Sequence, residues 1–186
     1  MKKILLVVLW LGSYCLAQHC GVERWAVKTL KDSKANQISK VPSLTTVEEM
    51  RGFPVPSRFR SNAARLQPVE FTRYQLRAML LGYKHEKDDD YHLVLASLQD
   101  QSLTMIAEIP RGRCSSKDIA STVDQERHWL IQKFGRIRQM GKMRWLETPV
   151  QVEVQGIGFF DTLHKQTGVS PNGVEIHPVL AISEVQ

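Results

Sequence analysis

The stretch that decides the fold is "DYHLVLASLQDQSLTMIAEIP", residues 90–110. It holds two apolar runs of the composition that is typical of β-strands. The polar letters QDQS, residues 99–102, separate these runs over a distance that suits a tight connection. The stretch therefore predicts two strands joined as a hairpin.

The preceding stretch, residues 69–86, has β-type composition over a length unusual for one strand. Gly82 stands where a bulge or a sharp bend is tolerated. We therefore expect a long, bent first strand before the hairpin.

A helix and two more strands are predicted after the hairpin. Ser115 and Asp118 have the spacing of a capping box, apolar side chains then recur on one helical face, and Gly135 ends the pattern. Residues 150–156, "VQVEVQG", alternate strictly between apolar and polar, as a half-buried strand does. The last predicted strand is "GVEIHPVLAI", residues 173–182.

This order of elements indicates one fold class. Three strands, a helix and two strands are the order of the OB-fold, a five-stranded Greek-key barrel with its helix between strands three and four. A β-sandwich would need more strands, and a parallel α/β fold would need a helix between most strand pairs. We therefore expect a mainly β protein with an OB-like barrel over residues 67–186.

The N-terminal part of the chain predicts export. Residues 1–17 carry two lysines, a short apolar run and a small residue, Ala17, at the expected cleavage point, which is the pattern of a signal peptide. No later apolar stretch has the length of a transmembrane helix. We therefore expect a secreted or periplasmic protein.

Residues 18–66 are expected to form an arm around the outside of the barrel. Residues 22–30 could form a short strand, and Thr45 with Glu48 predicts a capping box for a short helix that ends at Gly52. Prolines and arginines in residues 53–65 favour a solvated segment.

Cysteine usage and charge narrow the function classes. Beyond the predicted signal peptide the cysteines are Cys20 and Cys114, and two cysteines in an exported protein most simply form one disulfide. Ligation of a soft metal by these thiols is the less favoured alternative, because neither has a closely spaced partner. The net charge of +6 falls to +4 without Lys2 and Lys3 of the predicted signal peptide, and this moderately basic balance favours encounters with polyanions such as nucleic acid.

Two polar segments would meet at one end of such a barrel. In OB-folds the loops after strands one and four, here residues 84–90 and 161–173, flank the ligand-binding face. Glu175 and His177 are two positions apart on a strand and project to the same face. We predict a site there with catalytic residues Asp161, His164, Glu175 and His177, metal ligands Asp90, His92, His164 and His177, and ligand-binding residues His92, Gln166 and Asn172.

The leading interpretation of this site is a binding module for an anionic polymer or oligonucleotide, in which the histidines donate hydrogen bonds. The alternative is a metal-dependent, nuclease-like hydrolase, since imidazole with carboxylate suits Zn or Mn and carboxylates with an amide carbonyl suit Ca. A purely structural module of the cell envelope would leave the polar cluster unexplained.

Some residues of the predicted site also have a purely structural explanation, as turn residues or at a strand end. Residues 88–90, "DDD", could be an ordinary solvated turn. Asn172-Gly173 is a strong turn signal, and His177 before Pro178 could stand at a strand end.

A basic segment is the second candidate region. Residues 133–145, "KFGRIRQMGKMRW", include Lys133, Arg136 and Arg138 with Phe134 and Trp145 interleaved. Cations that follow a phosphate backbone and aromatic rings that stack on bases are what single-strand binding requires. The favoured alternative is a solvated loop whose aromatic residues belong to the core.

Three segments together resemble a known family. The combination of "GYKHEKDDDYHLVL", "MIAEIP" followed by Cys114, and "GIGFFDTLHKQTGVSPNGVEIHPVL" resembles a group of small, uncharacterised exported bacterial proteins. The resemblance implies a bacterial exported protein and carries no activity to these residues. An exported OB-fold with acidic and basic groups is also similar to the thermonuclease class, at the level of fold alone.

Overall fold

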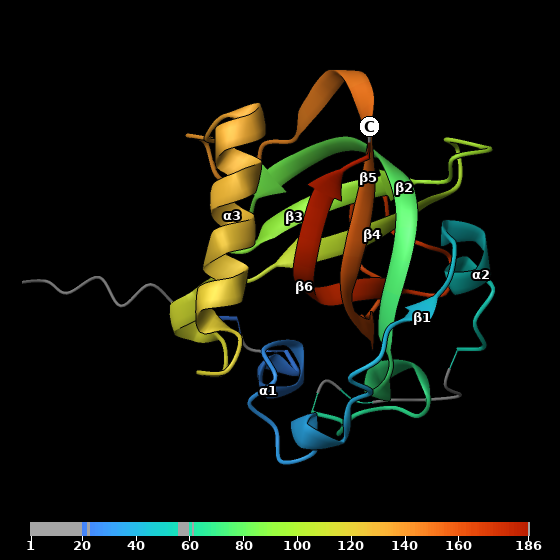
Figure 1. Cartoon of the computed structure of the whole chain (residues 1–186), viewed down its shortest axis with the longest axis vertical. Coiled ribbons are helices and arrows are strands. Elements are labelled where there is room, and N and C mark those ends of the chain that lie inside the picture. The colour runs from blue at the N-terminus through green and yellow to red at the C-terminus, as the bar shows by residue number, and fades with distance from the viewer. Residues whose placement is uncertain (1–19, 22, 56–59, 61, 186) are drawn as a thin grey trace, which may run out of the picture.

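The computed structural model describes residues 20–21, 23–55, 60 and 62–185. The predicted signal peptide, residues 1–17, lies outside the described residues. The described chain is mainly β, as predicted, with one six-stranded mixed sheet and a few helices (Figure 1). The strands are β1 (Ser43–Leu44), β2 (Arg73–His85), β3 (Tyr91–Ala96), β4 (Thr104–Ile109), β5 (Arg144–Phe160) and β6 (Val174–Glu184).

The strand pairings form a closed circuit. β2, β3 and β4 pair antiparallel in succession, β4 pairs parallel with β6, and β6 pairs antiparallel with β5. β5 also pairs antiparallel with β2, whereas the short β1 lies parallel to β2. The register of β2 shifts between Leu80 and Gly82, which confirms the predicted bulge. A Cβ atom on Gly82 would lie 2.6 Å from the carbonyl oxygen of Arg144, so the close approach of β5 requires glycine.

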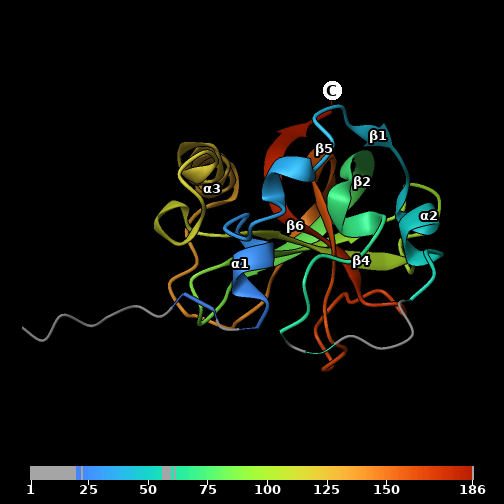
Figure 2. The same cartoon turned by 90° about the horizontal axis from the view of Figure 1, so that it is seen from below.

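The helices lie around the sheet. Figure 1 shows α3 along one side of the sheet and α2 on the other, and Figure 2 shows α1 in front of the strands from below. No helix in the described part of the chain is both long and apolar enough to cross a membrane. The helical elements are α1 (Trp25–Lys28), α2 (Val47–Arg51), α3 (Ala120–Phe134) and the 3₁₀ turns η1 (Ala35–Gln37), η2 (Val69–Phe71) and η3 (Gly112–Cys114).

Both predicted capping boxes need correction. That of α2 lies one residue later than predicted, because Thr46 accepts from the backbone of Glu49 and the Glu49 side chain accepts from the backbone of Thr46. The helix predicted to open at Ser115 begins after Ile119, which makes no side-chain cap. The stops are confirmed, since Gly52 and Gly135 are the C-caps.

The N-terminal arm is more deeply packed than predicted. Its expected strand is instead the helical turn α1, and the disulfide between Cys20 and Cys114, which confirms the predicted pair, ties the start of the described chain to η3. Arg24 forms a buried ion pair with Glu70 at 2.5 Å. Arg65, predicted to be solvated, is buried and bonds Asp32 at 2.7 Å. The arm therefore supplies buried charges to the body of the protein.

Candidate metal centre

His177 is the centre of a buried polar cluster. Its Nδ1 atom lies 3.1 Å from Glu108 Oε2 and 3.3 Å from Glu175 Oε1. Its Nε2 atom lies 3.5 Å from Asp90 Oδ2. Ligand atoms of Asp90, Glu108 and His177 all lie within 4.8 Å of one another, so this group could hold a metal ion.

Strand register brings these side chains together. His92 on β3 is paired with Glu108 on β4. The parallel pair Ala107–Ile176 then places Glu108 next to His177 on β6. Asp90 stands immediately before β3, at the end of the β2–β3 corner, which is the turn formed by residues 86–90. Adjacent strands thus carry one row of imidazole and carboxylate groups.

Asp90 and His177 are buried, and three of their polar side-chain atoms have no hydrogen-bond partner among the described residues. Each residue is 1% exposed. Among the described residues, neither carboxylate oxygen of Asp90 nor Nε2 of His177 has a hydrogen-bond partner. Buried polar atoms are nearly always satisfied, because leaving one unpaired costs about 1–3 kcal/mol. The gap between these two side chains is therefore suited to a cation or a shared proton.

Lys28 of α1 supplies the positive charge of the cluster. Its Nζ atom lies 3.4 Å from Asp161 Oδ2 and 3.9 Å from Glu175 Oε1. Burial alone would lower the pKa of Lys28, but the surrounding carboxylates, Glu175 foremost, raise that pKa above its usual range. The ammonium group therefore stays charged.

The carboxyl groups of the cluster differ in proton affinity. Burial raises the pKa of Asp90 well above its usual value, and burial likewise raises the pKa of Glu175. Partial burial would also raise the pKa of Glu108, but hydrogen bonds from His177 and His92 hold it well below the usual value. Glu108 is therefore ionised, while Asp90 and Glu175 retain protons more readily.

The ring of His177 also binds a proton tightly. Burial would lower its pKa, but the hydrogen bonds with Glu108 and Glu175 raise the pKa of His177 to about 9. Protons thus occupy the cluster at neutral pH, and a metal ion would have to displace them.

A cavity of about 390 Å³ lies beside the cluster. Three of its lining residues, Lys28, Glu108 and Asp161, also contact the buried groups. The Gln166 amide donates to Asp161 Oδ2 at 3.2 Å, and Trp25 and Asp88 complete this part of the wall. The cavity therefore adjoins the cluster through Lys28, Glu108 and Asp161, whereas Asp90 and His177 lie behind its wall.

The predicted site residues divide into three groups. Asp90, Glu175 and His177 lie together, and Asp161 joins them through Lys28. Gln166 and the exposed His164 line the cavity. Lys133, Arg136 and Arg138 lie in or after the last turn of α3, and Lys133 forms an ion pair with Glu184.

Two predicted ligands are engaged within the protein. The Nδ1 atom of His92 lies 3.1 Å from Glu108 and its Nε2 atom 2.9 Å from the carbonyl oxygen of Thr167, so His92 positions Glu108 and has no nitrogen free for a metal. The Asn172 amide nitrogen donates to the carbonyl oxygens of Met50 and Phe53. Asn172 therefore holds its loop against α2 and is not placed to bind a ligand.

The acidic turn is not an ordinary solvated turn. Asp89 and Asp90 are 2% and 1% exposed. Asp89 has a φ of 76°, a conformation that aspartate tolerates better than most residues. This local twist allows neighbouring carboxylates to face different surroundings.

The sequence patterns predict neither Glu108 nor Lys28 as a residue of the site. Glu108 is the one acidic residue in the apolar run "MIAEIP", which was a usable signal. Lys28 stands in a segment with the composition of a strand, so nothing in the local sequence marks it as a buried charge. Its partners, Asp161 and Glu175, lie more than a hundred residues further along the chain.

Comparison with known proteins finds no family model and no curated protein that matches this chain. The function proposed below rests on the geometry of the cluster and its cavity.

Proposed function

We propose that the protein is an exported, disulfide-linked OB-type barrel that binds a divalent metal ion at Asp90 and His177 and hydrolyses an ester, such as a phosphodiester, in the adjoining cavity. The pairing circuit β2-β3-β4-β6-β5-β2, with α3 between β4 and β5, supports the OB assignment. The disulfide is compatible with export.

The observation that carries the proposal is the pair of unsatisfied, buried ligand groups. Asp90 offers two free carboxylate oxygens, and His177 offers Nε2. Glu108 and Glu175 contact the other ring nitrogen of His177, as carboxylates commonly do in metal-binding histidines, where they fix the tautomer. Imidazole combined with carboxylate suits Zn or Mn better than Ca or Mg.

The charge of the cluster favours a cation over an anionic polymer as the direct ligand. Carboxyl groups from five residues lie around Lys28 and the protonated His177, and the cavity wall beside them adds Glu23 and Lys87. An oligonucleotide would meet repulsion here unless a metal ion were bound. The carboxylates are Asp88, Asp90, Glu108, Asp161 and Glu175.

The chain's own residues can support hydrolysis at the cavity. A divalent ion would supply Lewis acidity for an ester oxygen. Asp161 reaches the cavity, is oriented by Gln166 and Lys28, and is placed to accept a proton from water. The fixed charge of Lys28 would attract an anionic group of the substrate.

The test is titration of chelator-treated protein with Zn²⁺ and Mn²⁺ by calorimetry, followed by assay with bis-para-nitrophenyl phosphate. We expect one tightly bound ion, metal-dependent hydrolysis, and a loss of roughly tenfold or more in metal affinity in Asp90→Asn. Asp118→Asn, which makes the same change at an exposed residue, is the matched control. Absence of binding, or unchanged binding in Asp90→Asn, would refute the metal site; binding without hydrolysis would refute the enzymatic part alone.

A further inference from the structure

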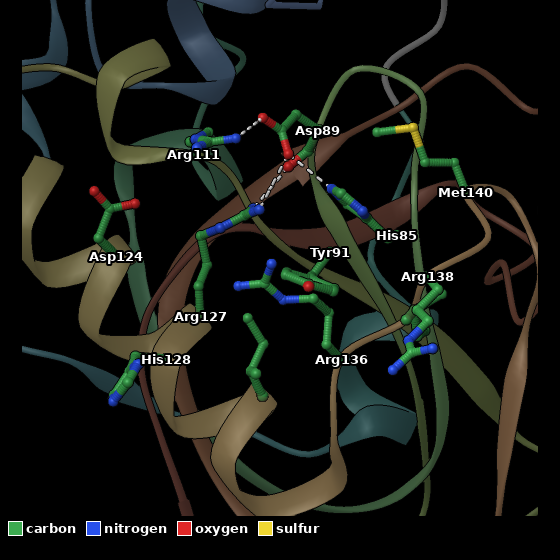
Figure 3. Close-up of a pocket in the computed structure, with 12 residues that line it drawn as sticks. His85, Asp89, Tyr91, Arg111, Asp124, Arg127, His128, Arg136, Arg138 and Met140 are labelled. Atoms are coloured by element: carbon green, nitrogen blue, oxygen red, sulfur yellow. Dashed lines mark hydrogen bonds and ion pairs between the residues drawn. The ribbon is translucent and has the colours of Figure 1, made fainter.

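A second cavity, of about 610 Å³, lies between α3, the β2–β3 corner and the residues that follow α3. Figure 3 shows that its side chains come from all three segments. The basic side chains in its wall are His85, Arg111, Arg127, His128, Arg136 and Arg138, and the acidic ones are Asp89 and Asp124.

One carboxylate, that of Asp89, pairs with half of the basic side chains in this pocket. Asp89 lies 2.5 Å from Arg111, 3.3 Å from Arg127 and 2.7 Å from His85. The other acidic residue, Asp124, accepts the backbone N–H of Gly112 at 2.9 Å. The pocket therefore carries more positive charge than its own carboxylates neutralise.

Arg136 and Arg138 are the cations left available for a ligand. Both are exposed, and in the chain as described neither makes a hydrogen bond or an ion pair. Figure 3 shows the Arg136 side chain reaching past Tyr91 toward Arg127, with Arg138 on the other side. Two unpaired guanidinium groups thus border one hollow.

Several contacts hold the inner wall of the pocket in place. Arg127 lies over the ring of Tyr91, 4.5 Å from its centroid, and donates to the carbonyl oxygens of Asp89 and Ile109. The ring of His85 stacks on Tyr91 at 4.9 Å. A ligand would meet a preorganised surface, which lowers the entropic cost of binding.

A smaller hollow of about 340 Å³ continues the positive surface. It shares Ile137 and Arg138 with the larger cavity and adds Lys142 and Arg144. The cations extend beyond the reach of a single small anion, so a ligand with several anionic groups fits them better.

We propose that this arginine pocket is a binding site for clustered phosphate groups. Guanidinium groups present planar, bidentate donors that match phosphate oxygens, and they stay charged at all physiological pH values. Free polyphosphate and a nucleic-acid backbone offer the same chemistry. The proposal is independent of the metal centre, because it shares no lining residue with the cavity beside that centre.

The experiment measures binding of inorganic triphosphate and of a short oligodeoxythymidylate to the chelator-treated full chain. We expect binding that weakens as salt rises and falls roughly tenfold or more in Arg136→Ala/Arg138→Ala. Arg77→Ala/Lys117→Ala also removes two positive charges, from an arginine that pairs with Glu153 and an exposed lysine, both outside the two hollows, and we expect no change. Near-ultraviolet circular dichroism of the variants verifies the fold.

The two probes identify the source of the phosphate groups. Tight binding of triphosphate alone would identify a small phosphorylated ligand, whereas tighter oligonucleotide binding that triphosphate displaces would identify a nucleic-acid backbone. The proposal is overturned if neither probe binds at low salt, if the double variant binds as the wild type does, or if sulfate competes as well as triphosphate.

Discussion

Asp89 and Asp90 are neighbours in the chain, yet their carboxylates belong to opposite sites. Asp89 bonds Arg111, Arg127 and His85 in the arginine pocket. Asp90 faces His177 in the buried cluster at 3.5 Å. The positive φ of Asp89 turns the chain between them. The β2–β3 corner therefore separates a site suited to a cation from a site suited to an anion.

Asp89→Asn should destabilise the protein by about 2–3 kcal/mol, because it leaves Arg127 and its neighbours without a carboxylate. Burial would raise the pKa of Asp89, but hydrogen bonds from Arg111 and His85 hold it below the usual value. The stabilisation is therefore complete above the unfolded-state pKa and is lost as pH falls through the lower, folded-state pKa. Urea denaturation across the acid range measures both effects, and an unchanged midpoint would show that the corner does not depend on this carboxylate.

Metal binding should strengthen as pH rises. The pKa of His177 is raised to about 9, and that of Asp90 is raised by burial, so both groups must release protons to a metal. Apparent affinity should climb from near neutrality until pH passes about 9. Calorimetry in buffers of different ionisation enthalpy measures proton release directly. Affinity that is independent of pH across this interval would contradict the assigned ligands.

Lys28→Met should destabilise the fold by about 3 kcal/mol, because Asp161 loses its cation partner and Glu175 keeps only His177. Adding Glu175→Gln should restore part of the loss, since the remaining buried charge is then smaller. A double-mutant cycle measured by thermal unfolding gives the coupling. Strict additivity would show that Lys28 acts through its aliphatic contacts rather than its charge.

Removing the disulfide should lower the free energy of unfolding by about 2–4 kcal/mol. The bridge between Cys20 and Cys114 also holds the segment that leads into α1 and Lys28. Cys20→Ser/Cys114→Ser should therefore lose metal affinity as well as stability. Chemical denaturation and metal titration of the same variant separate the two losses; unchanged affinity would show that α1 docks without the bridge.

The succession of β2, β3, β4, α3, β5 and β6 along the chain and the ends of the helices could be predicted because they depend on local patterns, whereas the two-residue β1 was not predicted. The bulge at Gly82 and the helix end at Gly135 follow from backbone preferences that a single sequence displays. The packing of the arm could not be predicted, because its ion pairs join residues that are far apart in the chain. Arg24 pairs with Glu70, and Lys28 pairs with Asp161. A segment of mixed composition gives no signal for such contacts.

The candidate site was predicted in part for the same reason. Glu175 and His177 share a face because they are two apart on one strand, which periodicity reveals. Glu108 joins them only through the parallel pairing of β4 with β6. The sequence marks Asn172 as a turn residue. Its amide donates a hydrogen bond to the carbonyl oxygen of Met50 in α2, and this contact depends on tertiary structure.

The most direct test of the metal centre is anomalous diffraction from crystals of the protein grown with Mn²⁺. The account predicts an anomalous peak at about 2.1 Å from His177 Nε2 and from a carboxylate oxygen of Asp90, and its loss in Asp90→Asn. An ordered, metal-free contact between these two side chains at saturating Mn²⁺, or a peak bound elsewhere, would contradict it.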